Sequence, residues 1–252
     1  MTALHALVTG GGRGIGAATA RRLVADGLHV TVLGRDHAAV QALAAENPER
    51  LHAVAADVAD AQQVARAVAD AQARFGPVQV LVNNAGQAES APFLKMDAGL
   101  WQRMLDVNLT GTMLCTQAVL PGMLAAGWGR IVNVASTAGQ VGYAYVAAYC
   151  AAKHGVIGLT RALALELAAK GVTVNAVCPG YTETDIVRDS IARVVAKTGR
   201  SAEDARAEFV KSNPQGRLVD PAEVADAVAW LCGSGAGAVT GQSVSVSGGE
   251  VM

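Results

Sequence analysis

Short apolar runs alternate along the chain with longer stretches in which apolar residues recur every three or four positions. The short runs, bounded by glycine or polar residues, predict buried strands, and the longer pattern predicts helices. The predicted strands span residues 4–9, 28–33, 51–56, 78–82, 130–135, 172–177 and 242–246, and the predicted helices span 17–26, 38–46, 61–75, 92–127, 147–170 and 221–232. Regular alternation of strand and helix predicts a parallel sheet with right-handed crossovers, which is an α/β doubly wound fold.

The segment from Thr182 to Arg217 interrupts this alternation, because it has helical stretches and balanced charge but no strand. An insertion after the sixth strand would overhang the carboxyl edge of the sheet, where open α/β sheets bind ligands. We therefore interpret residues 182–217 as a substrate lid. An ordinary surface helical hairpin is the alternative.

The composition suits one large core. With 252 residues, 52% of them hydrophobic and 16% charged, the chain can form a single domain over 1–252. The net charge of -1 gives no basic surface for nucleic acid or an anionic membrane, and no apolar run reaches the ~18 residues that cross a bilayer. Scattered cysteines and histidines predict no metal site and a reducing compartment. Because the N-terminus carries no signal-peptide pattern, we expect a cytoplasmic protein.

Tyr149 and Lys153 are candidates for acid–base chemistry. At helical spacing, side chains four residues apart lie on one face about one turn from each other. A nearby ammonium favours the phenolate and lowers the tyrosine pKa from ~10 toward neutrality. Ser136 follows the predicted strand 130–135, so its hydroxyl would leave the carboxyl end of that strand. The alternative for Tyr149 and Lys153 is an ordinary helix-surface pair.

A glycine-rich turn joins the first predicted strand to the first helix. Gly10, Gly14 and Gly16 form the pattern G-x-x-x-G-x-G, and a turn of this kind points helix N-terminal amides at a phosphate. The turn Asn83-Asn84-Ala85-Gly86 after the fourth strand has small and polar residues that let the backbone approach a flat ring. Either turn is also compatible with a purely structural role.

The end of the second strand carries Gly34 and Arg35 where a carboxylate would otherwise accept the adenosine 2'-hydroxyl. Asp36 is the nearest acid, and its position predicts the N-cap of the following helix. Arg13, in the glycine turn, is a second cation. Two arginines without a free acid favour a 2'-phosphate and hence NADP over NAD, whereas two solvated surface arginines are the alternative.

Asn108 lies in an apolar part of the predicted helix 92–127. A buried amide is costly unless it is hydrogen-bonded, so this side chain either packs against backbone groups or holds a water. The sequence leaves both interpretations open.

With these residues in place, the chain resembles the short-chain dehydrogenase/reductase family over essentially its whole length. The resemblance implies a seven-stranded Rossmann sheet and a catalytic tetrad. The motifs that carry it are TGGGRGIG at 9–16, Asp57, NNAG at 83–86, Asn108, Ser136, Tyr149-x-x-x-Lys153, and Pro179-Gly180 followed by Thr182.

The resemblance also implies a role for each tetrad residue. Tyr149 protonates the carbonyl oxygen of a ketone and acts as the base in the reverse reaction, and Ser136 hydrogen-bonds the same oxygen. Lys153 binds the nicotinamide ribose and lowers the Tyr149 pKa, while Asn108 holds a water of the proton relay. Hydride would pass between the nicotinamide and the carbonyl carbon.

The predicted contacts fall into two sets. The cofactor set is Gly10, Arg13, Gly14, Ile15, Gly16, Arg35, Asp57, Val58, Asn84, Ala85, Gly86, Tyr149, Lys153, Pro179, Gly180 and Thr182. The substrate set is Ser136, Gln140, Tyr145, Tyr149, Tyr181, Ile186 and Val187.

Within the family, the segments 213–225 and 238–242 are similar to those of 3-oxoacyl-thioester reductases and aromatic-polyketide ketoreductases. We therefore expect NADP(H)-dependent reduction of a 3-oxoacyl thioester or a similar ketone. The lid segment has seven basic and six acidic residues, so no cation cluster marks a carrier protein, and small ketones or CoA thioesters stay open. The alternatives are a secondary-alcohol (hydroxyacyl) dehydrogenase working oxidatively and a non-catalytic dinucleotide-binding regulator.

The resemblance implies self-association through the helices predicted at 92–127 and 147–170. Both are rich in Ala, Leu, Val and Gly, and helices that are apolar most of the way round need cover on both sides. A homotetramer or a homodimer is expected.

Overall fold

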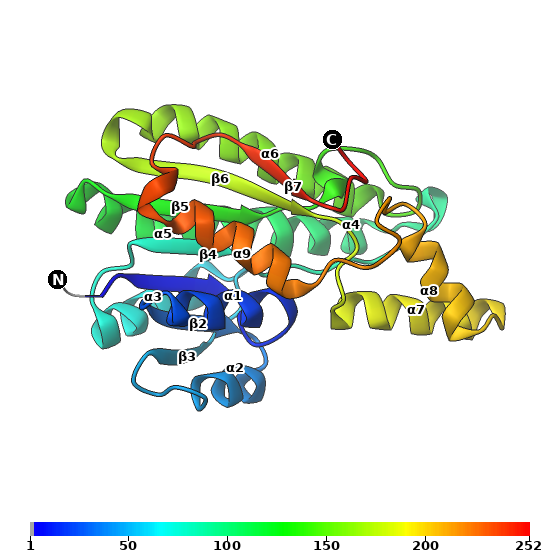
Figure 1. The fold of residues 1–252 in the computed structure, drawn as a ribbon, viewed down its shortest axis with the longest axis horizontal. Coiled ribbons are helices and arrows are strands. Elements are labelled where there is room, and N and C mark those ends of the chain that lie inside the picture. The colour runs from blue at the N-terminus through cyan, green and yellow to red at the C-terminus, as the bar shows by residue number, and fades with distance from the viewer. Residues whose placement is uncertain (1–2) are drawn as a thin grey trace.

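A seven-stranded sheet forms the centre of the computed structural model, which describes residues 3–252 (Figure 1). All neighbouring strands are parallel, in the order β3-β2-β1-β4-β5-β6-β7. The strands are β1 (His5–Thr9), β2 (His29–Gly34), β3 (Leu51–Ala55), β4 (Val80–Asn83), β5 (Gly129–Val134), β6 (Val172–Pro179) and β7 (Ser243–Val246). The strand order reverses between β1 and β4, and ligands bind outside the carboxyl ends of the strands at such a point. The predicted doubly wound fold is confirmed.

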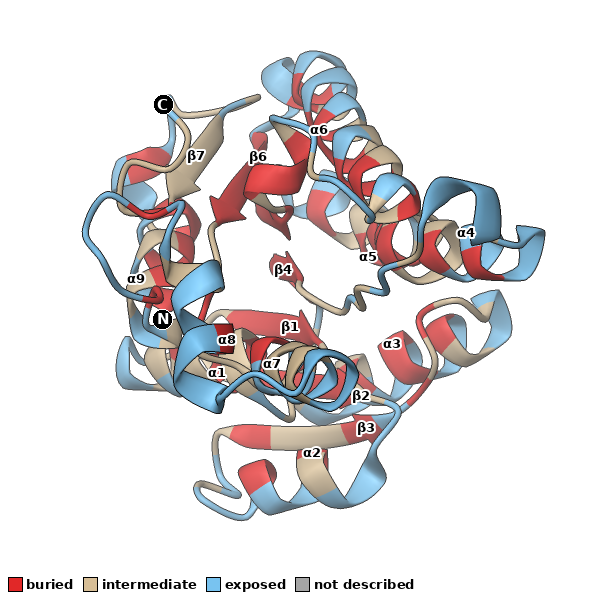
Figure 2. Ribbon diagram, turned by 90° about the vertical axis from the view of Figure 1, so that its right-hand side faces the viewer, coloured by how far each residue is buried: buried red, intermediate tan, exposed pale blue. Residues whose placement is uncertain are grey.

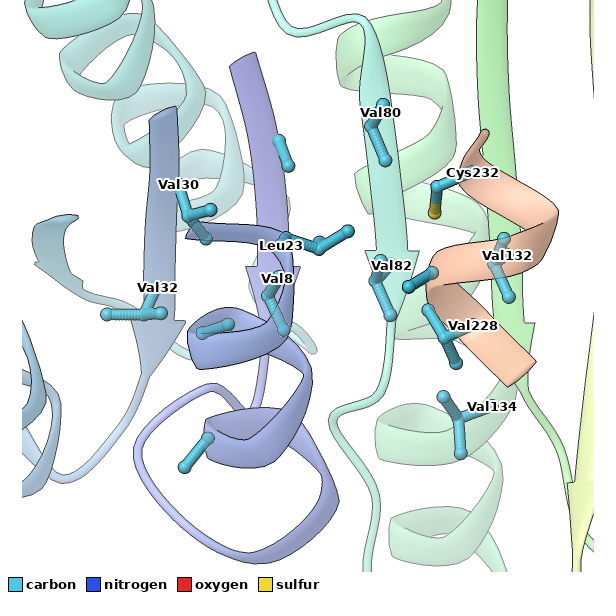
Figure 3. Close-up of a cluster of buried hydrophobic side chains, with 14 of the residues drawn as sticks. Val8, Leu23, Val30, Val32, Val80, Val82, Val132, Val134, Val228 and Cys232 are labelled. Carbon is cyan, nitrogen blue, oxygen red and sulfur yellow. The ribbon is translucent and has the colours of Figure 1, made fainter. Parts of the chain in front are cut away.

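Helices cover both faces of the sheet. They are α1 (Gly14–Ala25), α2 (His37–Ala44), α3 (Ala61–Phe75), α4 (Ala98–Leu105), α5 (Gly111–Ala126), α6 (Ala147–Leu167), α7 (Asp185–Thr198), α8 (Ala202–Val210) and α9 (Pro221–Cys232). Alternate residues of a strand face opposite sides. Val8 and Val82 accordingly pack with Leu23 of α1 and Val228 of α9, as Figure 3 shows, whereas Leu7 belongs to the separate core under α3, α5 and α6.

The helix predicted over 92–127 differs in detail from the observed one. A short 3₁₀ turn at Phe93–Lys95 comes first, and α4 then begins after Asp97, whose side chain accepts a hydrogen bond from the Leu100 amide at 2.7 Å. A π-helical turn, Asp106–Thr110, joins α4 to α5. Apolar spacing alone does not distinguish such a turn from α-helix, and π-turns are frequent at functional sites. Asn108 lies within it.

The α4–α5 stretch, Ala98–Ala126, has 29 residues and a mean hydropathy of 1.3. By length and composition alone it is sufficient to cross a membrane, although polar and charged residues such as Arg103 and Asp106 interrupt its apolar sequence. In the structure it packs against α3, β4 and β5 as part of a helical layer, with 33% of its most apolar window buried. Apolar surface on this stretch therefore lies outside the core of the single chain.

Helices α7 and α8 extend beyond the carboxyl ends of the strands. Figure 2 looks onto that edge of the sheet and shows both helices in front of it, mostly exposed. The ends of the segment are joined, because the Val219 amide donates to the Tyr181 carbonyl and the Glu183 amide donates to the Val219 carbonyl, each at 2.9 Å. The predicted helical segment is therefore an insertion with two tied ends, and its function as a lid stays a prediction.

Candidate active site

A cavity of about 890 Å³ opens at the carboxyl ends of the central strands. Its walls come from the glycine turn after β1, the loop after β4, the end of β5, the start of α6 and helix α7. The chain contains only four tyrosines, and all four line this cavity. Such a concentration of a scarce side chain at the switch point of the sheet indicates a functional site.

The glycine turn is shaped by close contacts. Gly10 and Gly14 have φ of 63° and 49°, a left-handed backbone that favours glycine. A Cβ on Gly16 would lie 2.2 Å from the Gly10 carbonyl oxygen, so this residue lets α1 pack directly on the turn. Arg13 at the N-cap of α1 makes no side-chain cap, which leaves the first helical amides free for an anion. The turn and the uncapped helix fit the phosphates of a dinucleotide.

Arg13 and Arg35 both line the cavity, and their side chains are 63% and 62% exposed. Arg13 pairs with Asp36, and Arg35 Nη1 lies 4.0 Å from Asp57 Oδ2. Asp36 also accepts a hydrogen bond from the Ala39 amide at 3.1 Å, which confirms the predicted N-cap of α2. Two guanidinium groups thus face the same end of the cavity, each within reach of one carboxylate.

Thirteen of the predicted cofactor residues line the cavity, and three do not. Gly16 instead supports the turn from behind, as described above. Val58 is buried, and a Cβ on Gly111 would lie 2.7 Å from its side chain, so it packs under the start of α5. Asp57 lies beside Arg35 at the rim. The lining residues are Gly10, Arg13, Gly14, Ile15, Arg35, Asn84, Ala85, Gly86, Tyr149, Lys153, Pro179, Gly180 and Thr182.

Asn108 is 1% exposed, and its amide is bonded to backbone groups. Nδ2 donates to the carbonyls of Gln87 at 3.0 Å and Met104 at 2.9 Å, and Oδ1 accepts from the Gln87 amide at 3.2 Å. Of the two interpretations that the sequence left open, the structure therefore supports packing against backbone. Asn108 holds the loop after β4 at the cavity wall, and its role with a water stays a prediction.

Lys153 is buried at the base of the cavity, only 4% exposed. Its Nζ donates to the Val134 carbonyl at 2.8 Å and lies 5.7 Å from the centroid of the Tyr149 ring. Burial lowers the pKa of Lys153 to about 8, because removal from water disfavours the charged ammonium. The two side chains that helical spacing predicted on one face are therefore brought together.

The pKa of Tyr149 shifts upward, opposite to the expected direction. Burial raises the pKa of the phenol to about 12, and the hydrogen bond with Ser136 counteracts this only in part. Desolvation of the phenolate dominates the pKa of Tyr149, and the Lys153 ammonium is directed at the Val134 carbonyl, so a lowering of this pKa by Lys153 stays a prediction. Ser136 Oγ also accepts a hydrogen bond from the Ala138 amide at 3.1 Å, which fixes its position at the end of β5.

Six of the seven predicted substrate residues line the cavity; they are Ser136, Tyr145, Tyr149, Tyr181, Ile186 and Val187. Gln140 does not, because its side-chain oxygen accepts a hydrogen bond from Ser245 Oγ at 3.0 Å and so faces β7. Its prediction as a substrate contact is not supported. Tyr145 has a φ of 68°, which is rare for a non-glycine residue, and its carbonyl accepts from the Ala91 amide at 2.8 Å.

Sequence reasoning missed several residues of this region. Tyr143 and Phe209 line the cavity, and Glu250 binds the Tyr143 hydroxyl at 2.6 Å. The scarcity of aromatic residues, 4% of the chain, was an available signal for the tyrosine. No local signal pointed to Glu250, which is 107 residues from its partner.

Comparison with known proteins agrees with this geometry. A family model described as short chain dehydrogenase matches residues 4–194. The chain belongs to this family. It is 42% identical to a 3-oxoacyl-[acyl-carrier-protein] reductase of Synechocystis over 257 residues, covering 100% of this chain and 98% of the relative. It is 41% identical to an acetoacetyl-CoA reductase of Rhizobium meliloti over 247 residues, covering 97% of both.

A solved structure of the same family is similar throughout. It is a crystal structure of a variant of actinorhodin polyketide ketoreductase with NADPH, 41% identical, with a TM-score of 0.95 and 99% of each chain covered. The family membership predicted from the sequence motifs is confirmed.

Proposed function

We propose that this protein is an NADP(H)-dependent ketoreductase that reduces a 3-oxoacyl thioester or a similar ketone. The observation that carries the proposal is the placement of Ser136, Tyr149 and Lys153 on the wall of one cavity, next to a glycine turn that fits a dinucleotide. The names of the relatives, which are reductases of acyl thioesters or polyketides, support the same substrate class.

Tyr149 is the proton donor in this proposal. With a pKa of about 12, the phenol keeps its proton at neutral pH and can give it to the oxygen of a ketone. Ser136, which bonds the phenol, provides a second hydrogen bond to the same oxygen, and a bound nicotinamide would supply hydride to the carbonyl carbon. Lys153 then stabilises the phenolate as a cation, because opposite charges attract strongly in a buried site.

Arg13 and Arg35 select the cofactor in this proposal. Each already lies beside a carboxylate, Asp36 and Asp57, so a 2'-phosphate would replace or share those partners. Guanidinium groups bind phosphate through charge-assisted hydrogen bonds. The free amides at the start of α1 would bind the pyrophosphate.

We further propose a cytoplasmic homotetramer, or a homodimer, built on α4, α5 and α6. These helices expose large apolar side chains, including Leu124 at 38% and Leu165 at 84% exposure. Exposed apolar patches of this kind mark protein interfaces.

The test of the proposed activity is turnover by the purified protein. We expect NADPH oxidation with acetoacetyl-CoA or a cyclic ketone, and much slower oxidation of NADH. Incubation of the corresponding alcohols with NADP⁺ measures the reverse reaction. A protein that turns over no ketone with either cofactor, but still binds NADPH, would contradict the proposal and support the non-catalytic regulator.

A further inference from the structure

The last residues of the chain turn back toward residues that line the cavity. After β7, Gly248 and Gly249 have φ of 64° and 93°, in the left-handed region that favours glycine. A Cβ on Gly248 would lie 2.1 Å from Asn213 Oδ1, so the turn is packed against the segment that follows α8. This turn directs the side chain of Glu250 toward Tyr143.

Glu250 contacts two parts of the site. Its Oε1 accepts a hydrogen bond from the Tyr143 hydroxyl at 2.6 Å, and that hydroxyl lies 2.9 Å from Thr137 Oγ1. Its Oε2 lies so close to Gly180 that a Cβ there would be 2.7 Å away. Burial first, and then the bond to Glu250, raise the pKa of Tyr143 far above its ordinary value, so the phenol stays a donor. The carboxylate is thus held by the Tyr143 hydroxyl and lies beside Gly180.

Tyr143 is the first member of a row of aromatic side chains, which we call the aromatic wall: Tyr143, Tyr181 and Phe209. The ring centroids of Tyr143 and Tyr181 are 6.3 Å apart and those of Tyr181 and Phe209 are 5.0 Å apart, both edge to face. Such pairs are a favoured aromatic geometry. All three side chains line the cavity.

The aromatic wall connects elements that are distant in sequence. Tyr143 precedes α6, which carries the catalytic tyrosine; Tyr181 is at the entry to the 182–217 segment, and Phe209 is near its exit in α8. Glu250 itself is absent from the cavity lining. Its hydrogen bond therefore fixes one end of a row of contacts that reaches both ends of the lid segment.

We propose that Glu250 is a positioning residue for substrate: by holding Tyr143, it fixes the aromatic wall and so shapes the part of the cavity that receives the ketone. This inference rests on the proposed ketoreductase function. Because Glu250 does not line the cavity, it acts through Tyr143 and not on the reacting atoms. The C-terminal tail then contributes to substrate affinity through Tyr143.

The first test compares Glu250→Ala, Glu250→Gln, Tyr143→Phe and the control Glu49→Ala, an exposed carboxylate after α2. We expect Glu250→Ala to raise the KM for the ketone about tenfold, because a Tyr143 side chain that is no longer held in place must be ordered when the ketone binds. The dissociation constant of NADPH and kcat should stay within about twofold, because the lost contacts hold the ketone equally in the ground state and in the transition state. Glu250→Gln keeps an acceptor and should restore most of the affinity, and Glu49→Ala should resemble wild type.

The double variant Tyr143→Phe, Glu250→Ala separates positioning from general structural damage. If Glu250 acts through the Tyr143 hydroxyl, removing both groups should raise the ketone KM no further than Tyr143→Phe alone. Effects that add in full would overturn the proposal. So would a Glu250→Ala variant whose ketone KM and NADPH affinity change together, or a Gln variant as impaired as Ala.

A measurement without turnover distinguishes this inference from the proposed function. Hydrogen exchange of the amides from 182 to 210 should be faster in Glu250→Ala than in wild type or Glu49→Ala. The reason is that the aromatic wall loses the hydrogen bond that holds Tyr143. If wild type reduces no ketone but this exchange difference is present, the proposed function fails and the positioning role stands. Unchanged exchange in Glu250→Ala would contradict the positioning role even in an active enzyme. Tyr143→Phe, which removes one oxygen, provides the same readout if Glu250→Ala does not fold.

Discussion

Burial determines the chemistry of the single residues at this site. It raises the pKa of Tyr149 to about 12 and lowers that of Lys153 to about 8, in each case favouring the neutral form. The phenol is therefore protonated at neutral pH, and the ammonium is the group of the pair that titrates nearest to neutrality. This assignment suits proton donation by Tyr149 in the reductive direction.

Replacing Tyr149 with Phe tests that assignment. The ring still packs at the start of α6, so we expect fold and NADPH affinity to be retained. Turnover should fall by at least the ~10² typical of a positioned acid–base group. Steady-state rates and a fluorescence titration with NADPH measure the two quantities. A variant that keeps most of its activity would show that Tyr149 is not the proton donor.

Replacing Arg35 with Ala tests cofactor selection. A charge-assisted bond to a 2'-phosphate is worth roughly 1.5–3 kcal/mol, so the KM for NADPH should rise about tenfold or more. The KM for NADH, which has no such phosphate, should change little. Arg74→Ala, an exposed arginine on α3, is the control. Equal changes for both cofactors would indicate that Arg35 only pairs with Asp57.

At the scale of elements, α7 and α8 are less firmly packed than the sheet. Only Val187 in α7 and Ala205 in α8 are buried. Other side chains of this segment form exposed ion pairs, including Glu183 with Arg188 at 3.7 Å and Arg200 with Glu208 at 3.3 Å. Surface pairs of this kind contribute little stability, so this segment should open more readily than the core.

We expect the segment 182–217 to close over substrate. Substitutions at Tyr181, Ile186 or Val187 should change the ranking of ketone substrates while NADPH affinity stays within a few fold. Closure excludes water from the carbonyl and strengthens its hydrogen bonds. Hydrogen exchange measures the motion directly. The segment is an ordinary surface hairpin if, without ligands, its amides are as protected from exchange as those of β5. The same conclusion requires that cofactor and substrate together leave this protection unchanged.

At the scale of the whole molecule, a buried histidine links stability to pH. His5 is fully buried, with Nδ1 2.8 Å from the Gly76 carbonyl oxygen and Nε2 2.9 Å from Thr31 Oγ1. Burial lowers its pKa from 6.5 to about 4, and the imidazoles of His29 and His52 add smaller effects in the same direction.

The unfolded chain therefore binds a proton at His5 that the folded chain does not, between pH 6.5 and about 4. The free energy of unfolding should fall as the pH is lowered through this window, by up to about 1.4 kcal/mol per pH unit for one proton. Urea unfolding at several pH values measures this dependence of the free energy of unfolding on pH. His5→Gln should reduce this slope, whereas the exposed control His37→Ala should leave it unchanged. An identical slope in His5→Gln would exclude His5 as its source.

Assembly is the other property of the whole molecule. Trp101, Leu124 and Leu165 are 37%, 38% and 84% exposed on α4, α5 and α6. A second copy covering these helices would bury them, and apolar burial stabilises by about 25 cal/mol per Å². We expect a tetramer or a dimer by light scattering at micromolar concentration. Leu165→Glu should weaken the assembly, and a monomeric wild type would contradict this prediction.

Sequence alone was sufficient for the features that depend on local spacing. Alternating apolar runs predicted all seven strands, because a strand buried on both faces must be apolar along its length. The spacing of Tyr149 and Lys153 predicted their proximity, since four residues correspond to about one helical turn. The capping role of Asp36 was equally local, and the structure confirms it.

Tertiary structure decided what depends on neighbours from distant parts of the chain. The pKa of Tyr149 rises because several elements enclose it, and desolvation then exceeds the effect of the adjacent lysine. Asn108 bonds the backbone of Gln87, and Gln140 faces Ser245, for reasons of packing that no local pattern contains. Glu250 reaches Tyr143 across 107 residues, because Gly248 and Gly249 turn the tail back toward it.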